Sequence, residues 1–311
     1  METHPRLTDF LKDPTAHRIR AGELEAVFLP AHGMLGASVR HRGVEILGRV
    51  DDLQDAAARG SSAGIPFLHP WANRLAEPRY RVQGRPVELD VSSPLLHLDE
   101  HGLPMHGVPW SLLSWIVTED RQNSVSARLE WSTSDLLRIF PFSHHVELTA
   151  SIQPDGVTLE TTLVAGSESS VPVSFGFHPY LRIPELSRAN WQLELPAMRK
   201  LLLDSRGIPT GDDETFGGFN ARLDEGSFDD GFALMHEQTS FTIAGATRRI
   251  SVDLLEGYRY TQIFAPKDKD YIAIEPMTAP TSALTSGRGL RLVNPGDRFR
   301  TVFRIRIDAA Q

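Results

Sequence analysis

The sequence predicts an almost wholly β protein, built as a large antiparallel β-sandwich. Short segments in which apolar and polar residues alternate recur from one end of the chain to the other, with turn signals between them. A period of two is typical of strands that bury one face. Helical periodicity is weak throughout. Strands this numerous and this regularly spaced favour two large antiparallel sheets packed face to face over a parallel α/β sheet.

The predicted strands can be followed along the chain. The first half contains alternating segments at 24–30, 110–120, 124–132, 144–152 and 157–165. The second half adds the segments WQLELP, SFTIAG, RRISVDLL, YTQIFAP, YIAIEP and TVFRIRID. Turn signals such as QPDG and NPGD separate neighbouring segments. Together these segments supply the strands of both sheets.

Two segments depart from this pattern. DDLQDAAARG at 51–60 is the best helix candidate, and it ends on a glycine where a helix C-cap would lie. The stretch 204–231 is rich in Gly and Asp and is the most irregular part of the chain. A loop of that length in a compact domain is usually functional or mobile. We expect it to form a rim over a binding site.

Length and composition indicate an ordinary globular protein. Of the 311 residues, 41% are hydrophobic and 23% are charged, which is enough to build a substantial core. All-β proteins often run to about 200 to 250 residues around one core. Neither an internal repeat nor a low-complexity linker divides the chain. We therefore predict a single domain over residues 1–311, acting as a monomer or homodimer.

Charge and cysteine content exclude several classes of partner and site. The formal net charge is −8, and no stretch gathers Lys and Arg into the basic face that nucleic acid binding requires. The lack of cysteine excludes disulfides, thiolate nucleophiles and Cys-ligated metals. METHPRLTDFLKD at the start carries charges where a signal peptide needs an apolar region, and no window approaches about 18 apolar residues. We expect a cytoplasmic protein with neither nucleic acid nor membrane as a partner.

Familiar nucleotide-binding, zinc-protease and serine-hydrolase motifs do not occur in the sequence. Any chemistry must therefore come from histidines and carboxylates on strands. In WANRLAEPRY, the adjacent Asn73 and Arg74 offer several directional donors that suit an oxygen-rich ligand. The alternative interpretation is an arginine salt bridge in a loop.

A second patch is LPMHGVPW at 103–110. His106 is followed by Gly107, which lets backbone approach closely, and Trp110 offers a flat apolar face for a sugar ring. A loop histidine with purely structural hydrogen bonds fits the same pattern. This patch therefore indicates a binding site only in combination with the other patches.

Two further patches place a titratable group among apolar residues. His178 lies in FGFHPYL, where burial disfavours its charged form and a nearby carboxylate would restore it. Glu275 interrupts YIAIEPMTAP and precedes a proline, which marks a strand end or edge. A carboxyl group in such a stretch has a partner or a raised pKa, and both are common at active sites. The alternatives are a buried histidine bonded to a backbone carbonyl and a buried structural ion pair.

Smaller signals accompany these patches. Asp229 in FDDGFAL and Gln262 in YTQIF have value only in combination with the other residues. The adjacent histidines at 144–145 cannot bind one metal ion together, because neighbouring residues in a strand point to opposite faces of the sheet. His69 and His101 lack partners at ligand-like spacing. We expect no metal site.

Taken together, the patches resemble the aldose 1-epimerase (galactose mutarotase) family. The matching segments occur in the family's order over most of the chain: ANRLAEPRYRVQG, MHGVPW, residues 140–183, FDDGFAL, YTQIFAP and IAIEPMTAP. The His-Pro-Tyr element and the Glu-Pro strand are the most diagnostic. The resemblance implies a galactose mutarotase-like supersandwich, in agreement with the strands above. It also implies a cofactor-independent isomerase that interconverts the α and β anomers of a small-molecule sugar, a hexose such as galactose or glucose.

The resemblance also implies roles for individual residues. His178 is the general acid and Glu275 the general base. The residues expected to bind sugar hydroxyls or the ring oxygen are Arg74, His106 and Asp229, with Asn73 and Gln262 as supporting contacts. The chain departs from the family where IPFLHPW precedes Asn73 and where Val108 replaces a second glycine. These changes border the expected pocket and concern which aldose is bound.

Three alternatives remain open. A glycoside hydrolase needs two facing carboxylates and leaves His178 without a role. A non-catalytic sugar-binding module would not need a matched acid and base. A sugar-6-phosphate 1-epimerase would need additional basic residues near the pocket. The candidates for these are Arg79, Arg81, Arg182 and Arg199.

Overall fold

The computed structural model describes residues 13–51, 53–224 and 226–309. The N-terminal segment that we predict is not a signal peptide begins with residues 1–12. These residues lie outside the described part of the chain. None of the helices formed by the described residues has the length and apolar character that a membrane-spanning helix requires.

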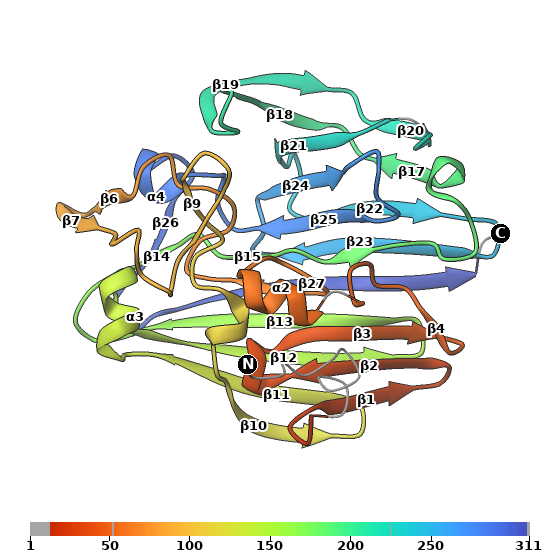
Figure 1. Ribbon diagram of the computed structural model, residues 1–311, viewed down its shortest axis with the longest axis horizontal. Helices are drawn as coiled ribbons and strands as arrows, with labels where there is room; N and C mark the ends of the chain where they lie inside the picture. Colours follow the sequence, from red (N-terminus) through yellow and green to blue (C-terminus); the bar gives the residue numbers. More distant parts are fainter. Residues whose placement is uncertain (1–12, 52, 225, 310–311) are drawn as a thin grey trace, which may run out of the picture.

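Two large sheets dominate the structure, as predicted (Figure 1). The first has nine strands in the order β10 (Ile116–Arg121), β11 (Ser124–Trp131), β12 (His144–Gln153), β13 (Gly156–Ala165), β27 (Arg298–Ala309), β23 (Arg248–Glu256), β22 (Thr239–Ala244), β17 (Gln192–Leu195) and β20 (Phe219–Arg222). The second has eight: β19 (Pro209–Phe216), β18 (Met198–Leu203), β21 (Phe228–Ala233), β24 (Tyr260–Ala265), β25 (Ile272–Met277), β15 (Gly176–Phe177) and β5 (Phe67–Leu68), with β16 (Tyr180–Leu181) also beside β25. Their registered pairs are antiparallel.

Smaller elements complete the fold. A four-stranded sheet contains β1 (His17–Ala21), β2 (Leu24–Leu29), β3 (Leu35–His41) and β4 (Val44–Glu45). Two-stranded pairs are β6 (Arg79–Val82) with β7 (Arg85–Glu88), β8 (His97–Leu98) with β9 (Pro104–Met105), and β14 (Val171–Val173) with β26 (Arg291–Val293). The helices are α2 (Leu53–Arg59), α3 (Ser134–Ile139) and α4 (Ala283–Ser286), with 3-10 turns at Pro30–His32, Trp110–Leu112 and Arg188–Asn190.

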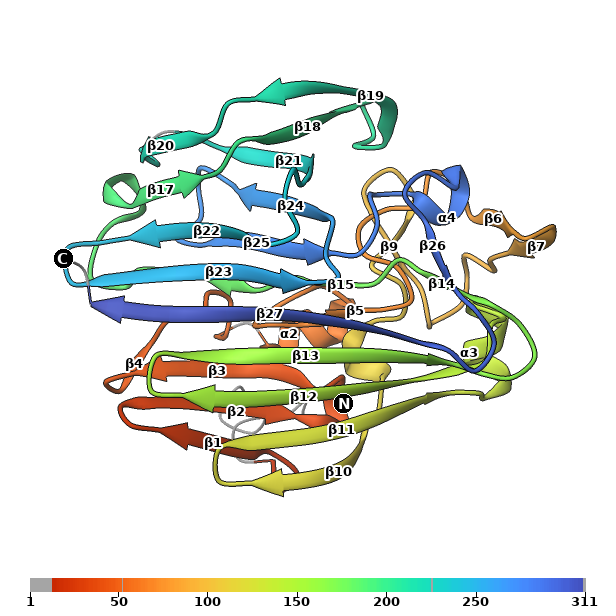
Figure 2. The ribbon, with the colours of Figure 1, turned by 180° about the vertical axis from the view of Figure 1, so that it is seen from behind.

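Side-chain alternation explains how the large sheets pack. Every second residue of β11 and β12 is buried, as the period-two pattern predicts. The sheets meet through aromatic contacts: Phe177 of β15 packs on Phe303 of β27 with ring centroids 5.0 Å apart. Figure 2 shows β27 running between β13 and β23 through the middle of the molecule. In both views β6, β7, β9 and α4 gather at one end of the sheets (Figures 1 and 2).

One local prediction is confirmed and one is wrong. The helix expected at 51–60 is α2, and Gly60 follows it with a left-handed φ of 66°, as a C-cap glycine does. The stretch 204–231 is not an irregular loop, because it contains β19, β20 and the start of β21. β19 is an edge strand whose residues are mostly exposed on both faces. Without a buried face it shows no apolar alternation, so the sequence pattern cannot reveal it.

The strand that carries Glu275 lies inside the second sheet. β25 pairs with β24 on one side, where Gln262 faces Glu275 in register. On the other side it pairs with β16 through Ala273 and with β15 through Met277. The ladder skips the residues between these two pairs, which accommodates Pro276 because proline has no N–H to donate. Pro276 is the last but one residue of β25, so the predicted strand end is confirmed, although β25 is not an edge strand of the sheet.

Candidate active site

A cavity of about 310 Å³ opens beside β25. The seven residues predicted from the sequence all line it: Asn73, Arg74, His106, His178, Asp229, Gln262 and Glu275. Among the cavities formed by the described residues, larger ones of about 680 and 480 Å³ lie elsewhere and contain no histidine. Volume alone therefore does not identify the site; the gathering of titratable side chains does.

His178 and Glu275 are in direct contact. Nε2 of His178 lies 3.2 Å from Oε1 of Glu275, and both side chains are almost completely buried. His178 is not inside a continuous strand, as FGFHPYL suggested, but between β15 and β16. Both of these short strands pair with β25, so the break between them places the imidazole beside the carboxyl group.

Burial shifts the two pKa values in opposite directions. Desolvation lowers the pKa of His178 to about 3, helped by the nearby positive charge of Arg49. Desolvation raises the pKa of Glu275 well above its usual range, and the negative charge of Asp229 adds to this, while Arg74 opposes it. Near neutral pH the pair therefore holds one transferable proton, with neither residue bearing an isolated charge. The two groups titrate as a unit.

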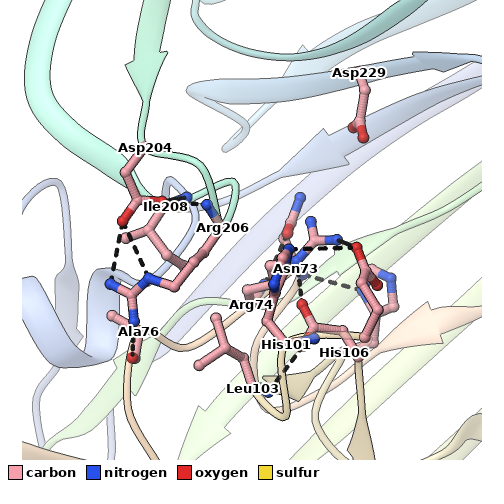
Figure 3. Close-up of polar contacts among 12 residues, drawn as sticks. Asn73, Arg74, Ala76, His101, Leu103, His106, Asp204, Arg206, Ile208 and Asp229 are labelled. Atoms are coloured by element: carbon pink, nitrogen blue, oxygen red, sulfur yellow. Dashed lines mark hydrogen bonds and ion pairs between the residues drawn. The ribbon is translucent and has the colours of Figure 1, made fainter.

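Arg74 and His106 also line the cavity, and the His106 ring packs edge-on against the His178 ring with centroids 5.6 Å apart. Nε of Arg74 lies 2.6 Å from Oδ2 of Asp99, which fixes the guanidinium group. The backbone N–H of Asn73 donates to Nδ1 of His106 at 3.1 Å, so the ring proton of neutral His106 is on Nε2. Burial lowers the pKa of His106 well below its usual range, with further lowering by His178 and Arg74. Figure 3 shows this cluster, with Asp229 pointing toward it from β21.

Backbone conformation at the cavity is unusual. Asn73, His106 and Arg49 have φ angles of 59°, 60° and 56°, in the left-handed region that side chains other than glycine seldom adopt. Such residues are common at functional sites because the surrounding structure must hold them. Gly107 also has the predicted role: a Cβ there would lie 2.2 Å from the carbonyl oxygen of His69.

Asp229 and Gln262 are joined by a hydrogen bond. Nε2 of Gln262 donates to Oδ1 of Asp229 at 2.8 Å. They stand on the adjacent strands β21 and β24, next to Glu275 on β25, so three neighbouring strands each supply one polar group. Burial raises the pKa of Asp229, although the Gln262 bond and Arg74 oppose the rise. In the described residues, no group of three or more His, Cys, Asp or Glu side chains is arranged to hold a metal ion.

Comparison with known proteins identifies the family. A family model for aldose 1-epimerase matches residues 18–306. The chain belongs to the aldose 1-epimerase family.

Relatives of this family member are distant in sequence. YihR of Escherichia coli strain K12, which is named as uncharacterized, is 26% identical over 246 residues, or 76% of this chain and 77% of that protein. A galactose mutarotase-like protein from Clostridium acetobutylicum has a TM-score of 0.82 at 21% identity, with 94% of this chain and 95% of that one covered. The Slr1438 protein of Synechocystis has a TM-score of 0.79 at 21% identity, with 100% and 99% covered. The structures establish the mutarotase-like fold, and the family supports a sugar epimerase or mutarotase.

Several cavity residues of this aldose 1-epimerase family member were not predicted. Arg49, Ser62 and Tyr180 line the cavity, and Glu100 reaches Nη2 of Arg74 at 3.4 Å. Tyr180 is part of FGFHPYL, so its distance of two residues from His178 was the available signal. The others come from distant segments that carry no motif.

One sequence interpretation is corrected. Trp110 does not offer a face to a sugar, because it is buried in a cluster with residues of β2 and α2 and donates its indole N–H to the carbonyl oxygen of Ser61. His69 has no partner at ligand-like spacing in the sequence, but the fold brings a histidine to it: its Nε2 lies 2.8 Å from Nε2 of His144, and both are buried. Nδ1 of His144 donates to the carbonyl oxygen of Phe142 at 2.6 Å, so this pair is a structural hydrogen bond between neutral rings.

Proposed function

We propose that this protein is an aldose 1-epimerase that interconverts the α and β anomers of a hexose such as galactose or glucose. The observation that carries the proposal is the 3.2 Å contact between His178 and Glu275 inside a polar cavity. Opening a cyclic hemiacetal requires one proton to leave the C1 hydroxyl and another to reach the ring oxygen. Both oxygens are bonded to C1, so two adjacent side chains can each serve one of them.

The chemistry of ring opening assigns the two roles. Glu275 as a carboxylate removes the proton from O1, and the electron pair of that O–H bond forms the C1=O1 double bond. The C1–O5 bond breaks with its electrons moving to O5, which takes the proton from Nε2 of His178. Rotation about C1–C2 then exposes the other face of the aldehyde. No cofactor is needed, because both protons move between side chains and sugar oxygens.

Ring closure uses the protonation states that opening leaves behind. Glu275 is then protonated and returns its proton to O1, while neutral His178 accepts the proton from O5. The two catalytic states differ only in which residue holds the single shared proton. The opposite pKa shifts of the pair favour neutral His178 with protonated Glu275 in the free protein, which is the state that closes the ring. Arg74, His106 and Asp229 would hold the sugar hydroxyls, with Asn73 and Gln262 supporting them.

Polarimetry tests the proposal. Freshly dissolved α-galactose and α-glucose should reach the equilibrium rotation faster with the protein than without it, in proportion to protein concentration. Sugar binding by calorimetry with no acceleration of either sugar would instead support the non-catalytic module. Release of phenol from an aryl glycoside would support the hydrolase.

One observation favours keeping the sugar-6-phosphate alternative. Arg79, Arg81, Arg182 and Arg199 are absent from the cavity lining, but Arg49 lines it. A guanidinium at that position could pair with a phosphate group. A kcat/KM for α-glucose 6-phosphate above that for α-glucose would select this alternative, and loss of that preference in Arg49→Gln would assign it to Arg49.

A further inference from the structure

Tyr180 contacts the imidazole of His178 in two ways. The two rings are stacked, with centroids 4.3 Å apart and planes inclined by 26°. The Tyr180 hydroxyl also lies 3.4 Å from Nε2 of His178, the nitrogen that faces Glu275. One side chain therefore touches both the plane of the ring and the atom that exchanges the proton.

A second residue fixes the position of the Tyr180 hydroxyl. Oγ of Ser62 lies 2.6 Å from it, and both groups are buried. Nη1 of Arg49 approaches the same oxygen at 3.5 Å, and its guanidinium group stands over the tyrosine ring at 5.4 Å. Ser62 comes from the segment after α2 and Arg49 from the segment after β4, and they lie 118 and 131 positions from Tyr180 in the chain.

Hydroxyl groups can donate or accept, and this matters beside a nitrogen that loses its proton. When Nε2 carries hydrogen, the Tyr180 oxygen can accept from it while its own hydrogen points to Ser62. When Nε2 is bare, the Tyr180 hydroxyl can donate to it and accept from Ser62. Either atom of the Ser62–Tyr180 contact can be the donor. Burial raises the pKa of Tyr180 to about 12, so the hydrogen stays on the phenol.

We propose that Tyr180 is a positioning residue for His178, and that Ser62 and Tyr180 form a hydroxyl relay that reverses its hydrogen bonds as Nε2 loses and regains its proton. This inference rests on the proposed function. Ser62 and Tyr180 line the cavity, and in the proposal they act on the chemical step through Nε2 of His178 and not on sugar binding. Ser62 acts only through Tyr180.

The test compares kcat and KM of variants by anomer exchange. Tyr180→Phe keeps the stacked ring and removes the hydroxyl, and we expect kcat to fall by about three- to ten-fold, as for the loss of one hydrogen bond, with KM within about two-fold. Ser62→Ala should lower kcat in the same way, and Ser62→Thr, which keeps a hydroxyl, should restore it. The double variant Ser62→Ala/Tyr180→Phe should be no slower than Tyr180→Phe alone, because the two residues act in series.

The matched control is Tyr80→Phe, which also removes a buried hydroxyl hydrogen bond, to the carbonyl oxygen of Ile139 at 2.8 Å, away from the cavity. It should leave kcat unchanged. Three results would overturn the relay: wild-type kcat in Tyr180→Phe, a raised KM with unchanged kcat, or losses that simply multiply in the double variant. If Tyr180→Phe does not fold, the Ser62 variants decide.

A second readout separates this inference from the proposed function. If the wild type shows no turnover, the proposed function fails, and nitrogen NMR of the His178 ring still tests the contact. The His178 nitrogen shifts should then change in Tyr180→Phe and remain unchanged in Tyr80→Phe. Unchanged shifts in both variants would refute the contact itself.

Discussion

The pKa values of Glu275 and His178 stand in the reverse of the order that the free side chains show. In water a glutamate loses its proton about two pH units below a histidine. Here burial raises the pKa of Glu275 and lowers that of His178 to about 3. The pair keeps a single proton over the pH range between those two values, and that one-proton state is the form that the proposed mechanism uses.

The pH dependence of turnover follows from this order. Turnover should fall as pH rises through the raised pKa of Glu275, because the pair then loses its only proton. It should persist below pH 6, because His178 takes up a second proton only near its lowered pKa of about 3. Exchange rates measured by NMR between pH 4 and 10, with circular dichroism to confirm folding at each pH, test this. An acid limb with a midpoint near 6.5, or turnover that increases as the pH rises above neutrality, would contradict it.

Individual residues differ in how far the sequence predicts them. His178 and Glu275 interrupt apolar stretches, and a titratable group in such a place is visible without a structure. Asp99, which holds Arg74, lies 25 positions away in the chain. Ser62 reaches Tyr180 across 118 positions. Contacts at such separation depend on the fold and leave no local pattern, so the partners that orient the site residues could not be predicted.

At the scale of elements, strands with one buried face are predicted and others are missed. β12 and β13 coincide closely with alternating segments. β19 has no buried face, and β15 and β16 are only two residues each, held by their pairing with β25. Alternation measures burial and not hydrogen bonding, which explains both failures.

The His69–His144 contact ties the segment after β5 to β12, and it should make stability sensitive to acid. Burial lowers the pKa of His144 to about 4 and that of His69 well below its usual range. The unfolded chain binds a proton at these residues below about pH 6.5 while the folded protein does not, so lowering the pH destabilises the fold. For His144 alone the loss approaches about 3 kcal/mol by pH 4.

His144→Gln should therefore reduce this acid sensitivity, because a glutamine amide can accept from His69 and donate to the Phe142 carbonyl oxygen without titrating. The free energy of unfolding should fall less between pH 7 and 4.5 than in the wild type, as measured by urea denaturation. His145→Gln is the matched control, since this neighbour on β12 is only half-buried on the opposite face. Equal pH slopes in both variants would contradict the explanation.

At the scale of the whole molecule, the described residues share one main apolar core. Its buried residues run from Ile19 on β1 to Ile307 on β27 and include Phe177 of the second sheet. We therefore propose, as the sequence predicts, that the chain forms one domain. Differential scanning calorimetry should show a single unfolding transition with equal calorimetric and van't Hoff enthalpies. Two separated transitions would indicate two domains.

The most direct test of the account is anomer exchange of α-galactose or α-glucose, whichever sugar turns over, by His178→Asn, Glu275→Gln and the double variant. Each single variant should lose about 10²- to 10⁴-fold in kcat while calorimetry still detects sugar binding. The double variant should be little slower than either, because the residues share one proton and work as a unit. His145→Gln should retain wild-type turnover. Single variants within a few-fold of wild type, or independent losses that multiply in the double variant, would contradict the proposed proton exchange.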